Sequence, residues 1–353
     1  MSLRVAVIGC GFQGRLHVEC FSRMPEVAVV AIADTDAGRL AEVGDSFRVK
    51  KRFADYRELL AAQPYDLVTI CTMPVHHAAM TIAAFEAGAH VLCEKPLALN
   101  AAEGASMVEA GRRAGKPLAI GYNLRFTPNA RTISSFIDGG RFGRPIYTRA
   151  WARASQVPWW GEHYRRDISG GGALAATAVH FLDLALHFAG FPEPATASAS
   201  AATVFPKKRG GTAPNARAAS QFTAEDIFSA HIRFGNGFWL NLEGSWIDNQ
   251  PSVNGAAAWD YSLDAMGEGA QVWLDPLMIR TETDAGAIVD VLPADAKSDV
   301  SFPPSVAALL ADVVAAIREG RPPLVTGEQA LVTQRIVDAI YASAALGREV
   351  EVR

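Results

Sequence analysis

The chain has 353 residues, of which 50% are hydrophobic and 20% charged, so the composition excludes a disordered protein and the length predicts two domains. The formal net charge of -4 gives no general attraction to nucleic acid, and we expect no nucleic-acid partner. No apolar run approaches the roughly 20 residues that span a bilayer, and the first apolar run is too short for a signal sequence, so we expect no membrane partner.

The N-terminal segment combines a strand, a glycine-rich turn and a helix. Residues 4–8 predict a short strand, the turn follows from Gly9 to Gly14, and a helix is predicted from Arg15 to Arg23. Gly9 permits the tight turn, Gly11 lets the backbone approach a pyrophosphate, and Gly14 allows close helix packing. The free N–H groups at the helix N-terminus suit phosphates. This arrangement predicts a dinucleotide site.

The second strand selects between the two nicotinamide cofactors. It is predicted from Val27 to Ala33 and ends at Asp34. A carboxylate there can accept hydrogen bonds from the adenosine ribose and would repel a 2′-phosphate. Asp36 follows, and no arginine stands directly after Asp34. We therefore expect NAD, and favour it over NADP.

Helices and apolar strands then alternate up to residue 121, which predicts a doubly wound parallel sheet. The predicted helices are Tyr56 to Ala62, Ala78 to Ala87 and Ala101 to Ala114, and the predicted strands are Leu67 to Cys71, His90 to Cys93 and Pro117 to Gly121. The four cysteines, Cys10, Cys20, Cys71 and Cys93, match no zinc spacing. They read as buried free thiols of a reducing compartment, so we expect a cytoplasmic protein and no metal.

Lys95 follows the strand that ends at Cys93. Pro96 biases Lys95 toward an extended or turn conformation, at the sheet edge where ligands bind in such folds. The alternative is that Glu94 and Lys95 are solvated turn charges. The Thr72–His77 loop ends on the same edge, so His76 or His77 could touch the nicotinamide, although each could equally face water at a helix start; for His76 we favour water.

After Gly121 the pattern becomes strand-rich and predicts an α+β domain with a large, mostly antiparallel open sheet. A helix is expected from Asn129 to Asp138, a hairpin at Phe234–Phe238 and a loop from Pro206 to Gln221. The predicted strands are Ile146 to Ala154, Ala195 to Val204, Phe228 to Phe234, Phe238 to Trp246, Ala258 to Met266 and Ala270 to Leu274. Two late helices are predicted at Ser305 to Glu319 and Glu328 to Ala345.

One predicted helix, Ala173 to Ala189, follows Gly170-Gly171-Gly172 and carries His180, Asp183 and His187. Three glycines before a helix allow another backbone or a ligand to come close. The two histidines lie two turns apart with Asp183 between them, so a metal site has to be considered. The set lacks a third strong ligand, and Asp183 is more simply a packing or hydrogen-bonding residue.

With these segments in order, the chain resembles the glucose-fructose oxidoreductase, inositol dehydrogenase and MocA family over nearly its whole length. The segments that carry the resemblance are Gly9 to Gly14, Asp34, Thr72 to His77, Glu94-Lys95-Pro96, Arg125 to Pro128, Gly170 to Asp183, Glu225-Asp226, Gly244-Ser245-Trp246 and Thr326-Gly327-Glu328. The resemblance implies a nicotinamide-binding Rossmann domain over residues 1–121. It also implies a substrate-binding and oligomerisation domain over residues 122–353, whose open sheet joins subunits into a homodimer or homotetramer.

The resemblance also implies the site residues. Lys95 and His180 correspond to the family's active-site lysine and histidine. Cofactor contacts are expected from Gly9, Gly11, Phe12, Gln13, Gly14, Asp34, Thr72, Pro74, His77, Glu94 and Lys95. Substrate contacts are expected from Asn123, Arg125, Trp160, Tyr164, Arg165, Thr177 and His180. The substrate class is a small polyol or sugar-like molecule.

The sequence departs from the family at Ala176, where many of these dehydrogenases have an aspartate four residues before the histidine. Such an aspartate would hold the tautomer of His180 and favour its charged form. With alanine there, either His180 stays mostly neutral and works with Lys95 alone, or the freed space admits a larger or anionic substrate group. Arg165 and Arg166 could pair with such a group, or could be structural.

The predicted reaction is hydride transfer between a substrate CH–OH carbon and NAD, with the hydroxyl proton exchanged through Lys95 or His180. A cationic nicotinamide disfavours protonation of Lys95, and His180 needs little tuning, so the sequence leaves open which takes the proton. Two alternatives remain: a non-redox enzyme that recycles NAD during glycoside hydrolysis, epimerisation or elimination, and a ligand-sensing regulatory protein. Retention of both Lys95 and His180 argues against the regulatory protein.

Overall fold

The computed structural model describes residues 2–155, 157–158, 161–205, 216–248, 259–283, 285–292 and 297–353. The chain forms two compact units. The first comprises residues 1–123 and 303–331, and the second comprises residues 124–302 and 332–353. The predicted division into residues 1–121 and 122–353 lies close to the first boundary. It did not include the return of residues 303–331 to the first unit.

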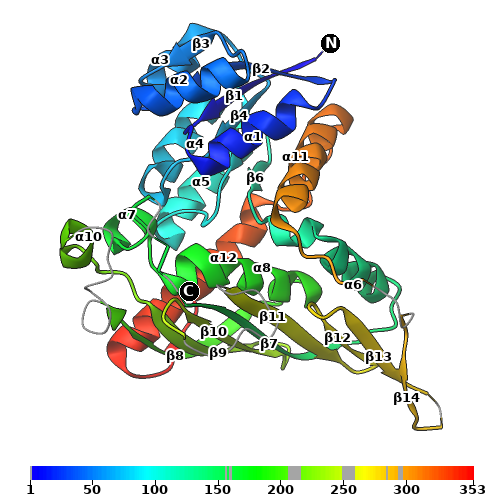
Figure 1. Ribbon diagram of the computed structural model, residues 1–353. Coiled ribbons are helices and arrows are strands. Elements are labelled where there is room, and N and C mark those ends of the chain that lie inside the picture. Colours follow the sequence, from blue (N-terminus) through cyan, green and yellow to red (C-terminus); the bar gives the residue numbers. More distant parts are fainter. Residues whose placement is uncertain are drawn as a thin grey trace. The chain divides into compact units, whose positions relative to one another are not determined.

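Among the described residues, the first unit forms a six-stranded parallel sheet in the order β3-β2-β1-β4-β5-β6 (Figure 1). Apart from the edge strand β3, its strands are mainly apolar because helices cover both faces of a parallel sheet; in β1, Val5 to Ile8 are at most 2% exposed. The predicted doubly wound sheet is confirmed. The strands are β1 Leu3–Ile8, β2 Val27–Ala33, β3 Lys51–Phe53, β4 Leu67–Ile70, β5 His90–Cys93 and β6 Leu118–Ile120.

Three helices of the first unit, α2, α3 and α5, begin at polar caps that the sequence carries. Asp36, Asp55 and Asn100 each accept hydrogen bonds from the first backbone N–H groups of a helix. The first helix starts at Phe12, three residues before the predicted start, and α2 and β3 were not predicted. The helices are α1 Phe12–Ser22, α2 Ala37–Ser46, α3 Tyr56–Ala62, η1 Pro74–His76, α4 His77–Glu86, α5 Ala101–Ala114 and α11 Phe302–Glu319.

Over the part of the chain that the structure describes, the second unit holds a nine-stranded sheet in the order β14-β13-β12-β11-β7-β10-β9-β8-β15. Only β7 and β10 pair in parallel, so the predicted, mostly antiparallel sheet is confirmed. The strands are β7 Pro145–Ala154, β8 Pro194–Ala202, β9 Ile227–Phe234, β10 Trp239–Ser245, β11 Trp259–Gly267, β12 Ala270–Trp273, β13 Met278–Glu282, β14 Ile288–Asp290 and β15 Val350–Glu351.

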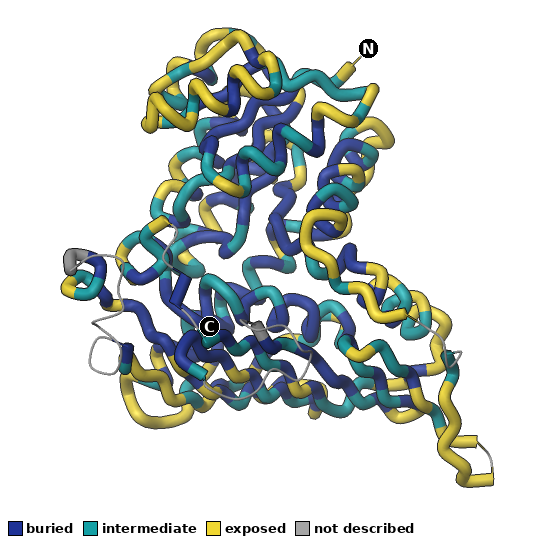
Figure 2. Tube along the Cα trace, viewed as in Figure 1, coloured by how far each residue is buried: buried dark blue, intermediate teal, exposed yellow. Residues whose placement is uncertain are grey.

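One face of this sheet is covered by helices. A π-helix, η3 Ala173–Ala178, and α8 Val179–Phe188 pack on β7, β9, β10 and β11, which gives the dark-blue core of Figure 2. The other helical elements are η2 Asn123–Phe126, α6 Pro128–Asp138, α7 Arg166–Ser169, α10 Ala216–Ser220 and α12 Gly327–Leu346. The hairpin at Phe234–Phe238 is confirmed by a hydrogen bond from the Phe234 N–H to the Phe238 carbonyl. The predicted loop 206–221 contains helix α10, and its residues 206–215 lie outside the described chain.

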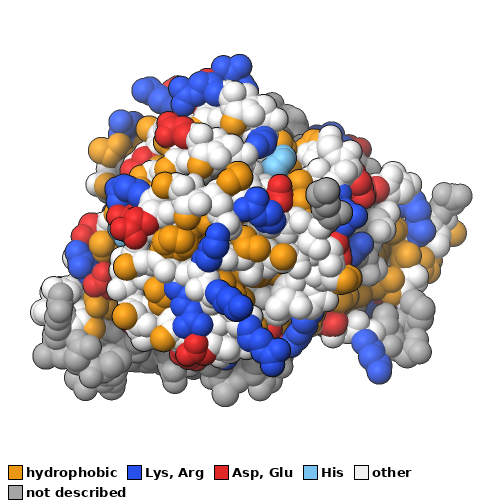
Figure 3. Space-filling model, turned by 90° about the horizontal axis from the view of Figure 1, so that it is seen from above, with side chains coloured by type: hydrophobic (Ala, Val, Ile, Leu, Met, Phe, Trp, Pro, Cys, Tyr) orange, Lys and Arg blue, Asp and Glu red, His pale blue; other side chains and the backbone are white. Residues whose placement is uncertain are grey.

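Among the described residues, one stretch, Arg166–Phe188, is long and apolar enough by composition to cross a bilayer, but 78% of its most apolar window is buried inside the protein. It has the character of a core helix. At the surface, Lys and Arg side chains lie in several groups with Asp and Glu side chains nearby (Figure 3). Exposed ion pairs such as Arg112 with Glu109 contribute little to stability.

Candidate functional site

The glycine-rich turn has the geometry that a dinucleotide requires. Gly9 has a φ of +94°, which favours glycine, and a Cβ added to Gly14 would lie 1.7 Å from the Gly9 carbonyl oxygen. A Cβ added to Gly11 would meet nothing within 4 Å. The first and third glycines therefore serve the protein's own packing, whereas Gly11 borders open space.

The start of α1 is suited to an anion. Its N-cap Gly11 supplies no side-chain hydrogen bond, and the first turn, which includes Phe12 and Gln13, contains no acidic residue. At the end of β2, the Asp34 carboxylate accepts hydrogen bonds from the N–H groups of Cys10 (2.6 Å) and Asp36 (2.8 Å). This fixes an acceptor for a ribose next to the turn. These residues fit NAD.

The loop after β4 is tied to the segment that carries Lys95. The His77 ring is buried, with Nδ1 2.9 Å from the Pro96 carbonyl oxygen and Nε2 3.1 Å from the Thr72 carbonyl oxygen. Burial lowers the pKa of His77, although both carbonyls and the Glu94 charge oppose the shift. His77 therefore joins two loops. Pro74 is also buried, whereas His76 is exposed, as favoured above.

Glu94 is buried at the end of β5 and is not a solvated turn charge. Its Oε1 accepts hydrogen bonds from Gln13 Nε2 (2.9 Å) and pairs with His17 Nε2 at 3.1 Å. The backbone N–H of Lys95 lies 3.3 Å from Oε2. Burial alone would raise the pKa of Glu94, but the hydrogen bond and charge of His17, the charge of Lys95 and the Gln13 amide together hold it below its usual value.

Lys95 lies at the carboxyl edge of the parallel sheet, one residue after Glu94. Lys95 is only partly exposed, and the Lys95–Pro96 peptide bond is cis. Burial of the ammonium group lowers the pKa of Lys95, while the Glu94 charge acts in the opposite direction. A lysine of lowered pKa gives up its proton more readily than an exposed lysine, which suits a group that exchanges protons at this edge.

In the second unit, the glycines before His180 make room for protein groups. A Cβ on Gly171 would lie 1.7 Å from the Tyr341 hydroxyl, and one on Gly172 would lie 1.9 Å from the Glu225 carbonyl oxygen. The Glu225 carboxylate accepts hydrogen bonds from the N–H groups of Gly172 (2.9 Å) and Leu174 (2.8 Å) and from the Tyr341 hydroxyl (2.9 Å). This helix start is therefore already capped by a carboxylate from the same chain.

The partly exposed face of the capped helix carries Ala176, Thr177 and His180, while most of its other residues are buried. Thr177 Oγ1 accepts a hydrogen bond from the Trp246 indole N–H at 3.0 Å. Because Ala176 lies in a π-helix, the turn before His180 is wider than an α-helical turn. Ala176 therefore does not stand one regular α-turn before the histidine, and no sequence pattern predicts this π-helix.

Asp183 is a packing and ion-pairing residue, as the simpler expectation held. Its carboxylate binds the Arg125 guanidinium through two hydrogen bonds of 2.6 and 2.8 Å, and both side chains are at most 1% exposed. Arg125 also lies over the Phe191 ring. His187 is held by Ser134 at 3.1 Å, and burial together with the Arg125 charge lowers the pKa of His187 to about 3. The predicted substrate contact of Arg125 would require it to leave this buried ion pair.

The remaining predicted substrate residues lie in different settings. Asn123 is buried and donates to the Ser305 hydroxyl within the first unit. Tyr164 is buried and stacks on Phe222, and Arg165 pairs with Asp167. Trp160 lies outside the described residues. Contact of these residues with substrate stays a prediction.

Sequence reasoning missed the supports behind Lys95 and His180. His17 was assigned no role, although Gln13 and His17 are four residues apart and so share one face of α1. Glu225 belongs to one of the segments that carry the family resemblance, but the sequence analysis assigned it no role. Helical spacing on α1 could have suggested that Gln13 and His17 act on one group, which is Glu94, whereas nothing in the sequence pointed to Tyr341.

Comparison with known proteins gives matches over both units. Residues 3–122 match a family model described as "Oxidoreductase family, NAD-binding Rossmann fold". Residues 135–352 match the model described as "Oxidoreductase family, C-terminal alpha/beta domain".

Relatives match over nearly the full length. D-glucoside 3-dehydrogenase of Escherichia coli strain K12 is 26% identical over 99% of this chain and 97% of its own. D-apiose dehydrogenase of Paraburkholderia graminis is 27% identical over 99% of this chain and 89% of its own. The structure of a levoglucosan dehydrogenase in complex with NADH and levoglucosan superposes with a TM-score of 0.84, at 23% identity and 100% coverage of both chains. That structure supports the fold.

Proposed function

The chain belongs to the GFO/IDH/MocA family of NAD-binding oxidoreductases, and from that premise we propose that Lys95 and His180 exchange the substrate proton during oxidation of a sugar or cyclitol hydroxyl. The observation that carries the proposal is Lys95, an amine of lowered pKa at the carboxyl edge of the NAD-binding sheet. A neutral amine can accept the hydroxyl proton as the C–H hydrogen leaves with its electron pair.

NAD supplies the hydride acceptor when it is bound. The protein's own residues bind and orient: Gly11 leaves the backbone open to the pyrophosphate, and Asp34 presents its carboxylate to the ribose. His180 lies on the partly exposed face of its helix, the face that in this proposal meets the substrate oxygen. A histidine can donate a hydrogen bond to that oxygen or accept its proton.

The relatives' names support the substrate class. They are dehydrogenases of D-glucosides, D-apiose, levoglucosan and inositols, all of which carry secondary hydroxyl groups. The likeness supports hydride transfer to NAD over recycling of the cofactor or ligand sensing. Accordingly, we propose a polyol or cyclic sugar as the substrate.

Replacement of Lys95 tests the assignment. Lys95→Met removes the amine but keeps much of the side-chain length, so the rate of NADH formation is expected to fall by about a hundredfold or more, while NAD affinity stays within about twofold. NADH absorbance with aldoses, glycosides, cyclitols and anhydrosugars measures the rate, and fluorescence titration measures NAD binding. Lys50→Met, at an exposed lysine of the same unit, is the matched control. Equal loss of rate and NAD binding would make Lys95 a cofactor anchor.

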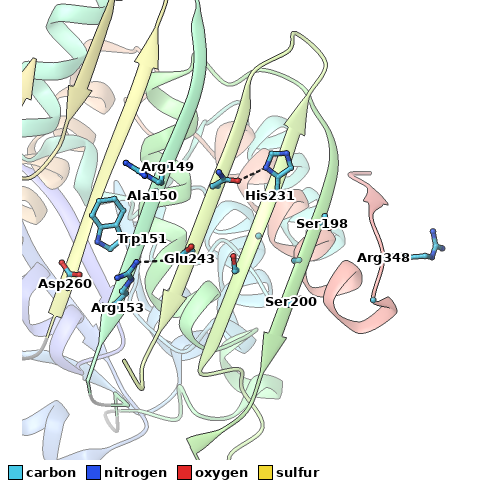
Figure 4. Close-up of a pocket in the computed structure, with 15 residues that line it drawn as sticks. Arg149, Ala150, Trp151, Arg153, Ser198, Ser200, His231, Glu243, Asp260 and Arg348 are labelled. Atoms are coloured by element: carbon cyan, nitrogen blue, oxygen red, sulfur yellow. Dashed lines mark hydrogen bonds and ion pairs between the residues drawn. The ribbon is translucent and has the colours of Figure 1, made fainter. Parts of the chain in front are cut away.

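We also propose a homo-oligomer that forms through the uncovered face of the second unit's sheet. A polar groove of about 750 Å³ lies there, lined by residues that include Arg149, Trp151 and Asp260 (Figure 4). Asp260 is 8% exposed, and neither of its carboxylate oxygens has a hydrogen-bond partner among the described residues; the same holds for Trp151 Nε1. Burying such groups without partners is costly, which supports a second copy that supplies them.

Light scattering during size-exclusion chromatography tests this assembly. The protein is expected to elute as a dimer or tetramer, and Asp260→Ala is expected to shift it toward smaller species. A monomer at tens of micromolar protein would contradict the proposal. A cytoplasmic location is a further proposal, supported by the four free cysteines, and fractionation of cells would test it.

A further inference from the structure

The Glu94 carboxylate occupies a space prepared for it in the first unit. Its side chain is 7% exposed, and a Cβ added to Gly121, at the end of β6, would lie 2.8 Å from its carboxyl carbon and from each oxygen. Glu94 is therefore fixed against the Gly121 backbone. A buried charge of this kind persists only with strong partners.

Those partners come from one face of α1. Gln13 Nε2 and His17 Nε2 both reach Oε1 of Glu94, at 2.9 and 3.1 Å. His17 is 0% exposed, and its Nδ1 lies 3.3 Å from the Cys71 sulfur. Burial raises the pKa of Cys71 well above its usual value, so the thiol stays protonated. Both ring nitrogens of His17 therefore have a partner: Nε2 faces the Glu94 carboxylate and Nδ1 faces the Cys71 thiol.

A purely structural link would need no charge here. Well-packed apolar residues commonly replace a buried ionic pair at no cost in stability. The retained carboxylate instead lies one residue before the candidate catalytic amine, and its charge is the one that favours protonation of that amine. A negative charge that must act on one group is most effective when its position is fixed.

We propose that His17 and Gln13 are positioning residues of the reaction: they hold the ionised Glu94 carboxylate at one place beside Lys95 and so set the proton affinity of the amine. This inference rests on the proposed function of Lys95. It gives α1 a second task, because the same helix that presents its N-terminus to the cofactor then also adjusts the proton acceptor.

The other groups around Glu94 leave Lys95 as the chief target of its charge. Five titratable groups interact electrostatically with the Glu94 carboxylate. They are Lys95 from its own segment, Cys93 from β5, Cys71 after β4, His17 from α1 and His77 from α4. Burial raises the pKa values of Cys71 and Cys93 and lowers that of His77, so these three stay neutral near pH 7.

The sign of the effect follows from the two opposing influences on Lys95. Burial lowers its pKa and the Glu94 charge raises it. Loss of the charge, or its displacement, leaves burial unopposed, so the amine becomes neutral at lower pH. A proton acceptor must be neutral, so the rising limb of kcat/KM against pH moves to lower pH as well.

The test is an NMR titration of the lysine side chains in the full-length protein without NAD, with Lys95→Met used to assign the Lys95 signal. We expect Glu94→Gln and His17→Leu each to move the Lys95 titration about one pH unit or more lower. His17→Gln, which can still donate a hydrogen bond, is expected to stay near the wild type. Val18→Ala, a buried change on the same helix, is the matched control and should leave the titration in place.

A second variant keeps the proposal testable if the buried change His17→Leu prevents folding. Gln13 is partly exposed, and Gln13→Leu removes one donor with less effect on the core, so a smaller shift in the same direction is expected. An unmoved Lys95 titration in His17→Leu or Gln13→Leu, with Glu94→Gln shifted, would overturn the positioning role. An unmoved titration in Glu94→Gln would overturn the whole inference. The proposed function fails separately, if Lys95→Met retains the hydride-transfer rate.

Discussion

Two buried carboxylates, one in each unit, lie behind the residues proposed for catalysis, and different partners hold them. Glu94 and Glu225 are almost equally buried, at 7% and 6% exposed. Side chains hold Glu94, and its pKa is lowered in spite of burial. Backbone N–H groups and one tyrosine hold Glu225, where burial prevails and raises the pKa. Burial alone therefore does not decide the state of these two carboxylates: the side-chain partners of Glu94 outweigh it, whereas the hydrogen bonds to Glu225 do not.

The difference assigns different tasks to the two groups. Glu94 acts by its charge on a neighbouring amine, whereas Glu225 acts mainly as a hydrogen-bond acceptor that closes the start of the helix leading to His180. A helix N-terminus carries a partial positive charge and free N–H groups, so an acceptor there is effective without a full ion pair.

Removal of Glu225 should have the largest effect on stability. Glu225→Ala leaves the N–H groups of Gly172 and Leu174 and the Tyr341 hydroxyl without their acceptor, so we expect a loss of about 3 kcal/mol or more. Thermal unfolding followed by circular dichroism measures the loss. Glu282→Ala, at an exposed position of the same unit, is the control. A change no larger than that of the control would show that water replaces the carboxylate.

The pH dependence of stability should separate the two carboxylates. For Glu94, the lowered pKa gives a stabilisation that is full above about pH 4.5 and is lost as pH falls through the lowered value. For Glu225, the raised pKa means that stability falls as pH rises above about 4.5 toward the raised value. Each pKa unit is worth about 1.4 kcal/mol.

Isosteric variants measure these two contributions. Melting temperatures of wild type, Glu94→Gln and Glu225→Gln are compared between pH 4 and pH 8. The melting temperature of Glu94→Gln should stay below that of the wild type at neutral pH. The difference in melting temperature between Glu225→Gln and the wild type should shrink as pH rises. If the melting temperatures of the two variants depend on pH in the same way, the pKa values of Glu94 and Glu225 are not shifted in opposite directions.

Arg166 offers a finer test on the second unit. Its guanidinium lies 4.4 Å from the centre of the Tyr341 ring, beside the phenol that donates to Glu225. An exposed cation–π contact is worth about 0.5–1 kcal/mol, so Arg166→Ala should lower stability by that amount. If Arg166 instead receives an anionic substrate group, the KM for acidic sugars will rise with stability unchanged. Arg165→Ala serves as the neighbouring comparison.

Most elements of the first unit could be predicted, because its strands are mainly short apolar runs and its turns carry glycine and proline. Helix α2 and the short strand β3 were missed; in β3, three residues with two exposed charged side chains give no periodic signal. The supports of the site were missed for another reason. His17 and Glu94 are 77 residues apart, and Glu225 caps N–H groups more than 50 residues away. Such pairs depend on the folded arrangement of the strands, and no local pattern contains them.

Gly121 shows how a residue without a side chain can govern proton chemistry. Its φ lies outside the left-handed region that favours glycine, so its requirement concerns volume alone. A single methyl group there would compete with the Glu94 carboxylate for the same space. Gly121→Ala would then alter the titration of the Lys95 amine, which follows the neighbouring strand β5. The replacement of one hydrogen atom by a methyl group would be read out as a change in the pKa of a lysine that it does not replace.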